Sequence, residues 1–214
     1  MNKLLYVVML LVGAIGFAQN DAKAEKLLDE VTQKINGYDN IYIDFTYVLE
    51  NTEENIKQET RGDVTLKGDL YHVNFLGTKQ IFDGKNTYTI ITEDQEVNIT
   101  NAQENEEETL TPSKFFTFYK NGFTYKWDKL ENMNGRKIQY VKLLPIDSDS
   151  DIKHILLGVD VNTRHIYKLI ETGNNNTTTT LTVAEFKPNE TISSQLFSFD
   201  EPKYKAQGYL INRL

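Results

Sequence analysis

Residues 61–90, RGDVTLKGDLYHVNFLGTKQIFDGKNTYTI, alternate apolar and polar side chains in four short segments. Successive side chains of a β-strand point to opposite faces, so this alternation predicts strands. The Gly68-Asp69 and Asp83-Gly84 pairs favour two-residue hairpin turns, because glycine adopts positive φ without steric cost. The apolar positions are Val64, Leu66, Tyr71, Val73, Phe75, Ile81, Tyr88 and Ile90. We therefore expect a β-meander around which the rest of the chain is organised.

Both faces of this predicted meander carry large apolar or aromatic groups, and no reactive residue stands out in it. An antiparallel sheet with one buried face would usually have polar side chains on its other face. We therefore expect one face of the meander to contact something other than the core of the protein.

The segments before the meander predict a helix and a strand. Residues 21–36 carry apolar side chains at helical spacing, with Asp21 as the N-cap and Gly37 as the stop. Residues 41–49 place five large apolar side chains at strict period two, which is the clearest strand pattern in the chain. We expect the apolar stripe of the helix to dock on the sheet.

The acidic segment NAQENEEE, residues 101–108, interrupts the strand pattern and predicts a solvated loop. Thr111 as N-cap and Pro112 at the first helical position then predict a second helix that ends at Gly122. Its aromatic residues are Phe115, Phe116, Phe118 and Tyr119. Four aromatic side chains exceed one narrow apolar stripe, so this helix either plugs the core or covers an apolar opening as a lid.

The strand pattern resumes after residue 122. Strands are predicted at residues 123–130, 138–144, 155–161, 166–170 and 177–186, and a last docked strand at residues 209–211. No internal repeat, linker or shift in composition divides the chain. The expectation is a mainly β (α+β) protein in which residues 19–214 form a single domain.

The first 18 residues resemble a cleaved secretory signal. Lys3 precedes an apolar run, and Gly16 and Ala18 stand at positions −3 and −1 of a cleavage site. The run is shorter than the roughly 20 apolar residues of a membrane-spanning helix. The chain has no cysteine, so we expect neither disulfides nor a lipid anchor on the exported protein. The net charge of −8 disfavours binding to nucleic acid or to an anionic bilayer.

No known catalytic motif or metal-ligand motif is present. The histidines His72, His154 and His165 are scattered singly; the last two could face each other across a hairpin, but they lack a third ligand. The aspartates from Asp147 to Asp151 imitate a calcium loop, but Ile152 stands where glycine is required. We therefore expect no enzyme, no catalytic residue, no metal and no cofactor. What remains is binding, although periodicity alone does not separate an apolar ligand cavity from an ordinary filled core.

Several segments together resemble the periplasmic carrier of outer-membrane lipoproteins, the LolA-like family. They are IDFTYVLE at residues 43–50, RGDVTLKGD at 61–69, IFDGKNTYTI at 81–90, the aromatic segment at 111–119, and TLTVAEFKPNETISSQLFSFD at 180–200. The resemblance implies a single incomplete antiparallel β-barrel, a strongly curved sheet whose concave apolar face is covered by helices. It also implies a soluble periplasmic carrier that moves lipoproteins from the inner to the outer membrane by binding their acyl chains.

The resemblance assigns expected roles to residues and partners. The acyl cavity is expected to be lined by Leu28, Val31, Ile41, Ile43, Phe45, Tyr47, Tyr71, Val73, Phe75, Phe82, Tyr88 and Ile90. The lid is expected to consist of Phe115, Phe116 and Phe118. The implied partners are acylated lipoproteins or another lipid, an inner-membrane releasing complex and an outer-membrane acceptor, with the carrier itself a monomer.

One position departs from the family pattern. Proteobacterial carriers place an arginine and a proline directly after the lysine of the second strand, and that arginine is associated with lid closure and cargo transfer. Here Lys67 is followed by Gly68-Asp69, so no arginine takes over this role. The alternatives are a carrier of another hydrophobic envelope molecule, such as a free lipid or a lipid-linked pigment, a structural envelope protein, or an exported hydrolase.

Overall fold

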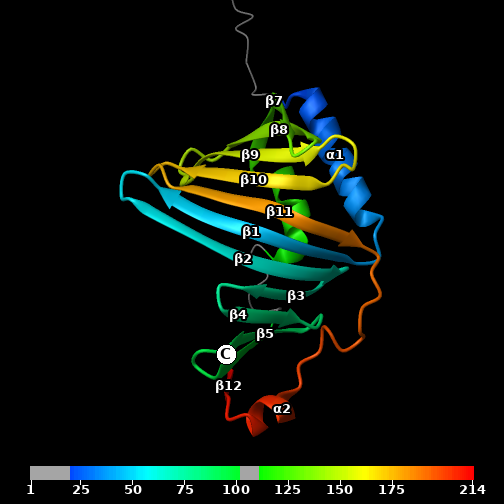
Figure 1. Ribbon diagram of the computed structural model, residues 1–214, viewed down its shortest axis with the longest axis vertical. Helices are drawn as coiled ribbons and strands as arrows, with labels where there is room; N and C mark the ends of the chain where they lie inside the picture. Colours follow the sequence, from blue (N-terminus) through cyan, green and yellow to red (C-terminus); the bar gives the residue numbers. More distant parts are fainter. Residues whose placement is uncertain (1–19, 102–110) are drawn as a thin grey trace, which may run out of the picture.

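The computed structural model describes residues 20–101 and 111–214. The predicted signal segment, residues 1–18, and most of the predicted acidic loop lie outside the described residues. The described chain is mainly β, as predicted, and forms one curved sheet that is not closed (Figure 1).

The described residues form a 12-stranded sheet in the order β12-β6-β5-β4-β3-β2-β1-β11-β10-β9-β8-β7. The strands are β1 (Ile41–Asn51), β2 (Ile56–Lys67), β3 (Leu70–Phe75), β4 (Thr78–Phe82), β5 (Asn86–Ile91), β6 (Glu96–Asn101), β7 (Phe123–Met133), β8 (Arg136–Pro145), β9 (Ile152–Asp160), β10 (Ile166–Gly173), β11 (Thr178–Pro188) and β12 (Leu210–Arg213). All neighbouring pairs are antiparallel except β12 and β6, which are parallel. The predicted fold class, an incomplete antiparallel β-barrel with a strongly curved sheet, is confirmed. The parallel β12 is added at the edge by the C-terminal segment, which crosses the outside of the sheet before it pairs.

The meander of residues 61–90 is confirmed as the consecutive strands β2 to β5. Gly68 adopts φ 57° in the two-residue turn between β2 and β3. The predicted Asp83-Gly84 turn is shifted by one residue: the Asp83 amide donates to the Asn86 carbonyl at 3.2 Å, so Gly84 and Lys85 are the two central residues. The Asp83 carboxylate accepts hydrogen bonds from the Lys85 and Asn86 amides, each at 2.8 Å. Burial acts to raise the pKa of Asp83, but the hydrogen bonds from Asn86, Tyr88 and Lys85 outweigh it and hold this pKa below its usual range.

Helix α1 (Ala22–Asn36) is confirmed together with both of its predicted ends. The Asp21 carboxylate accepts a hydrogen bond from the Lys23 amide at 2.8 Å, and Gly37 is the C-cap. The buried residues of the helix are Ala24, Leu27, Leu28, Val31, Thr32 and Ile35. This stripe packs in the main core, on the concave face of the sheet.

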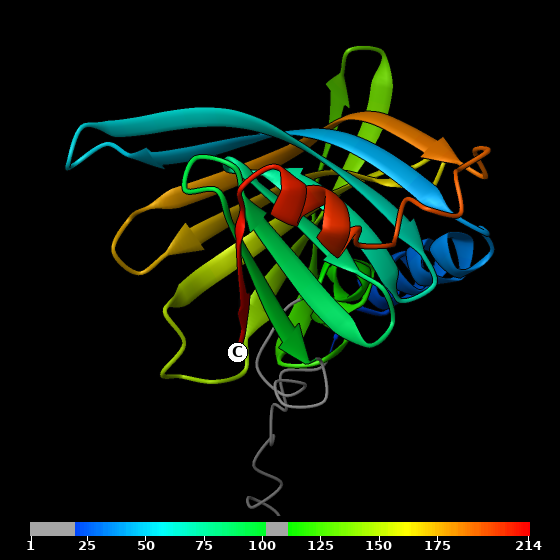
Figure 2. The same cartoon turned by 90° about the horizontal axis from the view of Figure 1, so that it is seen from below.

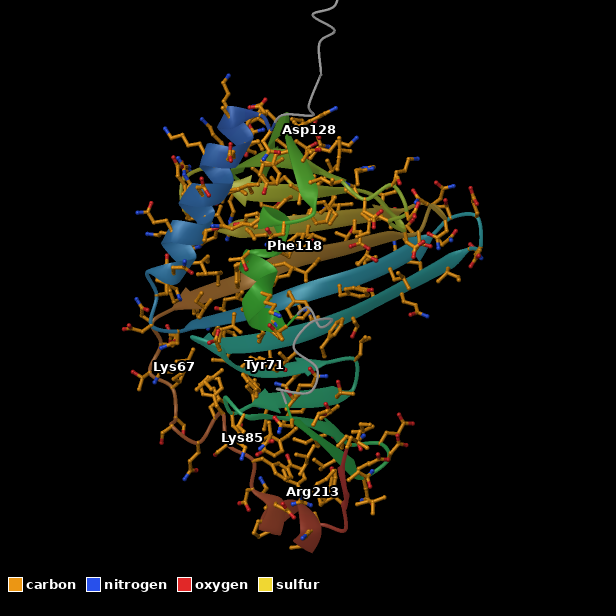
Figure 3. All side chains as sticks on the ribbon, turned by 180° about the vertical axis from the view of Figure 1, so that it is seen from behind. Lys67, Tyr71, Lys85, Phe118, Asp128 and Arg213 are labelled. Atoms are coloured by element: carbon orange, nitrogen blue, oxygen red, sulfur yellow. The ribbon has the colours of Figure 1, made fainter. Side chains whose placement is uncertain are left out.

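The predicted second helix is instead two 3-10 helices, η2 (Pro112–Phe116) and η3 (Phe118–Lys120). Thr117 separates them with φ −135° and ψ −5°, a conformation that is neither helical nor extended. Phe115 lies in η2 and Phe118 in η3, on either side of this break. Their rings lie 6.1 Å apart between centroids. Figure 3 shows α1 and this aromatic segment, with Phe118 labelled, in front of the concave face.

The C-terminal segment covers the opposite, convex face of the meander. Helix α2 (Glu201–Ala206), which no sequence pattern predicted, lies there beside β12 (Figures 1 and 2). A second core forms beneath it from Ile81, Ile90 and Val97, with Tyr88, Ile99, Phe199, Tyr204, Tyr209 and Ile211 packed around them. The second apolar face of the meander thus contacts the protein's own tail. Within residues 20–101 and 111–214, no helix combines the length and hydropathy needed to cross a bilayer.

Candidate functional site

An apolar cavity of about 140 Å³ lies between the concave face of the sheet and η2. All the described residues around it are apolar: Ile43, Phe45, Val64, Leu66, Val73, Pro112, Phe115, Phe116, Ile166, Leu181 and Val183. A void with such a lining offers no hydrogen-bond partner to water, so it suits hydrocarbon.

Strand register explains how five strands direct their apolar side chains into one cavity. Ile43 of β1 pairs with Val64 of β2, and Val64 pairs in turn with Val73 of β3. On the other side of β1, a register shift brings Phe45 opposite Val183 of β11. Directly paired side chains share a sheet face, so these positions form one continuous apolar surface.

The aromatic segment closes the cavity on its open side. Phe116 is 4% exposed, and its ring packs edge-on against that of Phe115 at 5.4 Å between centroids. Phe118 does not line the cavity; its ring contacts Phe123 of β7 at 5.9 Å between centroids. Of the three predicted lid residues, two therefore contact the cavity and the third packs behind them.

Tyr119 fastens this segment to α1. Its hydroxyl lies 2.9 Å from the Thr32 hydroxyl and donates to the Leu28 carbonyl at 3.2 Å. Its carbonyl accepts a hydrogen bond from the Tyr125 hydroxyl at 2.6 Å. Burial raises the pKa of Tyr119 to about 12. The η3 end is thus held by buried hydrogen bonds, whereas the η2 residues that line the cavity contribute apolar contacts.

The structure places most of the predicted cavity residues in the main core, but few of them at the cavity. Ile43, Phe45 and Val73 line it. Leu28, Val31, Ile41, Tyr47, Tyr71, Phe75 and Phe82 belong to the same core without lining it.

Tyr88 and Ile90 lie in the second core, on the other face of the sheet. Phe82 pairs with Thr87, which puts Thr87 and Thr89 on the concave face and the intervening Tyr88 and Ile90 on the convex face. The expectation that these two residues share the cavity with Phe82 is therefore wrong.

Several cavity residues were absent from the predicted set: Val64, Leu66, Pro112, Ile166, Leu181 and Val183. The alternation of Leu181 and Val183 with threonines was a usable signal for a strand with one apolar face. Its place beside β1 depends on a pairing between residues far apart in the sequence, such as Phe45 with Val183, which no local pattern reveals.

The histidines do not form a metal site. His154 lies opposite Thr172 in the β9–β10 pair, so it does not face His165. The His165 Nε2 lies 2.8 Å from the Tyr38 hydroxyl, and the His165 ring stacks on Phe186 at 3.9 Å between centroids. Burial, with Lys34 nearby, lowers the pKa of His165. Among the described residues, no group of three potential ligands could hold a metal ion.

The fold and the cavity define the class of protein. It has an open, strongly curved sheet, and helical segments cover the concave face of this sheet over an apolar cavity. The family model described as outer membrane lipoprotein carrier protein LolA matches residues 14–169. The chain belongs to this family. No curated protein matches its sequence.

Solved structures share the fold at low sequence identity. An uncharacterised conserved protein from Thermus thermophilus is 11% identical, with a TM-score of 0.57, over 90% of this chain and 99% of that one. LprF from Mycobacterium bovis is also 11% identical, with a TM-score of 0.52, over 82% of this chain and 98% of that one. At such identities the likeness establishes the common fold alone.

Proposed function

We propose that this protein is a periplasmic carrier that binds the acyl chains of lipoproteins between its concave sheet face and η2. The observation that carries this proposal is the wholly apolar cavity beneath Phe115 and Phe116, in a chain of the lipoprotein carrier family. Described groups suited to catalysis or metal binding do not gather around this cavity, which favours a binding protein over an enzyme.

The size of the cavity shapes the mechanism. An engineered cavity of about 150 Å³ accommodates a benzene-sized molecule. The cavity of about 140 Å³ in this protein is of that size, so it is far too small for a long acyl chain. Cargo must therefore displace Phe115 and Phe116, which act as the lid, while Tyr119 keeps the far end of the aromatic segment attached to α1.

Energetics favour such a displaceable lid. At about 0.8 kcal/mol for each buried methylene, complete burial of two or three long chains would exceed the practical ceiling of roughly 18 to 21 kcal/mol for noncovalent affinity. A carrier that releases its cargo must bury less. Competition between the lid and the cargo for the same apolar surface reduces the net affinity and allows transfer.

The cellular role follows as part of the proposal. Residues 1–18 act as the export signal, and residues 19–214 form the soluble, monomeric carrier domain in the periplasm. An inner-membrane releasing complex supplies the lipoprotein, and an outer-membrane acceptor receives it. The structure offers no arginine after Lys67 for the transfer step, so the acceptor must recognise another feature.

Binding of a synthetic triacylated lipopeptide tests the proposal, with the variant Phe115→Ser/Phe116→Ser/Phe118→Ser compared with wild type. We expect the triple variant to change both lipopeptide affinity and the stability of the empty protein. The matched control, Leu130→Ser/Leu210→Ser, replaces exposed apolar residues away from the cavity and should change neither. Unchanged affinity and stability in the triple variant would refute the lid role.

Mass spectrometry of ligands retained by the protein from its native periplasm identifies the cargo class. Acylated peptides are the expected result. Recovery of a free lipid or a lipid-linked pigment instead would assign the same cavity to another hydrophobic molecule.

A further inference from the structure

Strand β2 (Ile56–Lys67) extends well beyond its neighbour β3 (Leu70–Phe75). Their pairing ends where Asp63 meets Asn74. Within the described part of the chain, residues 56–62 pair with β1 on one side and with no strand on the other. Figures 1 and 2 both show the β1–β2 hairpin projecting past the adjacent strands. We call the unpaired side of residues 57–61 the open edge.

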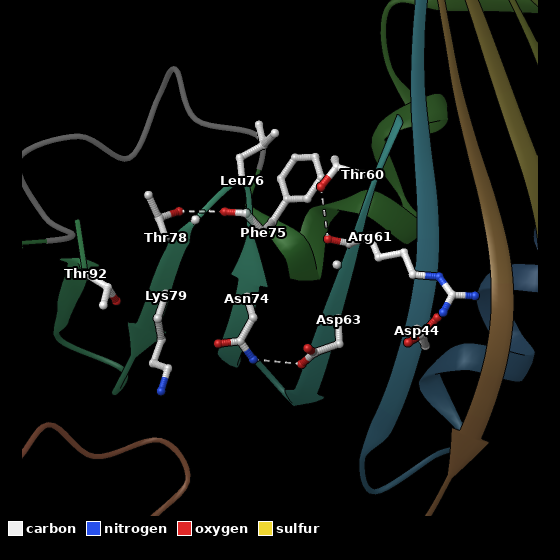
Figure 4. Close-up of a pocket in the computed structure, with 12 residues that line it drawn as sticks. Asp44, Thr60, Arg61, Asp63, Asn74, Phe75, Leu76, Thr78, Lys79 and Thr92 are labelled. Carbon is white, nitrogen blue, oxygen red and sulfur yellow. Dashed lines mark hydrogen bonds between the residues drawn. The ribbon is translucent and has the colours of Figure 1, made fainter. Parts of the chain in front are cut away.

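Hairpin geometry identifies the main-chain groups that face the open edge. A two-residue turn makes its flanking residues, Lys67 and Leu70, a hydrogen-bonded pair. Hydrogen-bonding direction alternates along a strand, so Asp63 also bonds toward β3, and the N–H and C=O groups of Arg61, Glu59 and Lys57 point the same way. The Arg61 carbonyl there accepts a bond from the neighbouring Thr60 hydroxyl at 3.5 Å, a long contact from a side chain where a strand partner would lie (Figure 4).

The β3–β4 turn ends the ladder with an unusual residue. Leu76 has φ 52° and Gly77 has φ 74°, so both lie in the left-handed region. That conformation costs a residue with a Cβ roughly 1 to 2 kcal/mol, and asparagine or aspartate usually occupies such a position. Leu76 is nevertheless a large apolar residue, and it is 63% exposed. A strained, exposed apolar side chain beside an open strand edge indicates a contact surface.

A pocket of about 340 Å³ occupies the gap between the open edge and this turn (Figure 4). Both sheet faces contribute to it, because the strands diverge there. Gly62 and Phe75 lie on the concave side, and Asp63 and Asn74 on the convex side.

A pair of aromatic rings connects the lining of this pocket to the lining of the apolar cavity. Phe45 lines the cavity, Phe75 lines the pocket, and their ring centroids are 5.4 Å apart. Both rings pack over Gly62, where an added Cβ would approach them to 2.6 and 2.8 Å. A ligand whose hydrocarbon entered the cavity beside Phe45 would therefore have its polar portion next to the open edge.

We propose that the open edge of β2 binds the polypeptide that adjoins the acylated residue of a lipoprotein, as an added extended strand. This inference rests on the proposed function and names a second part of the cargo. Recognition through main-chain hydrogen bonds tolerates many peptide sequences. The charges around the pocket agree with such tolerance, because Arg61 and Lys79 are balanced by Asp44 and Asp63.

Three kinds of synthetic ligand test the proposal on the full mature chain. The first is a tripalmitoylated cysteine followed by a neutral six-residue peptide. The second is a pair of N-methylated isomers of the same molecule: one carries N-methyl groups on the odd-numbered peptide amides and the other on the even-numbered amides. Two isomers are needed because strand pairing uses only the amides on one side of the peptide. The third is the tripalmitoylated cysteine amide without a peptide.

We expect the first ligand to bind about tenfold more tightly than the third, which corresponds to a few net hydrogen bonds. One N-methyl isomer should lose this gain and the other should keep it. In the variants Glu59→Pro and Arg61→Pro, which remove an outward donor from β2, the gain should fall below about twofold while the third ligand binds as it does to wild type. The matched control is Asn132→Pro, which removes an outward donor from the other edge strand, β7, next to its Asn134-Gly135 turn.

Each alternative outcome is distinct. Equal affinity of all ligands for the wild-type protein would overturn the peptide site and leave the acyl cavity intact. No binding by any ligand would overturn the carrier function and this inference with it. A concentration-dependent dimer of the empty protein that Arg61→Pro abolishes would assign the open edge to a second copy of this chain. The N-methyl comparison uses the wild-type protein, so it decides the matter even where a proline variant does not fold.

Discussion

The hydroxyls of Thr32 and Tyr119 lie 2.9 Å apart in the core and join α1 to η3. Tyr119 is fully buried, and its hydroxyl also donates to the Leu28 carbonyl of α1. The Thr32 hydroxyl oxygen lies 3.1 Å from the same carbonyl oxygen. A helix and a short aromatic segment from distant parts of the chain are thereby fixed to each other beside the cavity, which makes η3 the anchored end of the proposed lid.

Tyr119→Phe should lower the free energy of unfolding by about 1 to 2 kcal/mol, because it removes a buried hydroxyl and its hydrogen bonds while it keeps the ring. Chemical denaturation measures the change. Tyr209→Phe, at a ring that packs against Tyr204 in the second core, is the control and should have a smaller effect. Equal effects of the two substitutions would contradict the anchoring role.

Alkaline pH should weaken the same anchor. Burial raises the pKa of Tyr119 to about 12 in the folded protein, from the usual 10.0 of a tyrosine. The folded state therefore keeps the proton more tightly, so stability is fully present below pH 10 and declines as the pH rises from 10 toward 12. Two pKa units correspond to a loss of about 3 kcal/mol.

Unfolding measured between pH 9 and pH 12 tests this expectation. The wild-type protein should lose more stability over that range than Tyr119→Phe, which has no titrating hydroxyl at this position. Parallel pH profiles of the two proteins would show that another group carries the alkaline dependence.

Gly62→Ala should destabilise the protein by about 1 to 3 kcal/mol through overpacking. The new Cβ would lie 2.6 Å from Phe45 Cζ and 2.9 Å from the Asn74 main-chain oxygen. A ring can shift, but the carbonyl belongs to the β2–β3 pairing. Gly37→Ala is the matched control, since its Cβ would meet its neighbours at ordinary contact distances of 3.4 and 3.7 Å. A Gly62→Ala protein as stable as Gly37→Ala would contradict the close packing.

Val73→Phe should reduce lipopeptide affinity at least tenfold, about 1.4 kcal/mol, because the larger side chain fills the cavity that cargo would enter. Val48→Phe makes the same change on the convex face of β1, where Val48 pairs with Glu59, and should leave affinity unchanged. Fluorescence titration with the triacylated lipopeptide measures both. Similar affinity of the two variants would separate ligand binding from this cavity.

Ile90→Ala should cost about 2 to 5 kcal/mol of stability, as expected for a buried isoleucine, without altering lipopeptide affinity. Ile90 belongs to the second core beneath α2, on the face away from the cavity. Denaturation and ligand titration on the same sample separate the two effects. A loss of affinity in a variant that remains folded would place Ile90 in the binding site after all.

The alternation of apolar residues was sufficient to predict the strands, because period two is a local property of the backbone. The meander, the strand at residues 41–49 and α1 with its Asp21 cap are all confirmed. The assignment of faces failed in β4 and β5. Thr87 lies opposite Phe82, whereas Tyr88 lies opposite Ile81, so Phe82 and Tyr88 are on different faces of the sheet.

The cavity could be predicted in part. The sequence indicated an apolar sheet face and an aromatic segment that either plugs the core or covers an opening as a lid, and the resemblance to the carrier family favoured the lid. Leu181 and Val183 were missed because their contact with Phe45 depends on the pairing of β1 with β11 across the length of the chain. Helix α2 was not predicted because it has only six residues and none of them is buried, so it lacks the apolar stripe that marks an amphipathic helix.

For the meander of residues 61–90, the sequence by itself determined which residues are extended and where glycine permits the chain to reverse. The tertiary structure decided what each face contacts: α1 and η2 on the concave side, the C-terminal segment on the convex side. It also decided that β2 extends beyond the end of β3. Among the described strands, this leaves one edge of β2 unpaired beside the cavity. The physical reason is that strand periodicity is encoded over neighbouring residues, whereas register and partner choice depend on packing between residues far apart in the sequence.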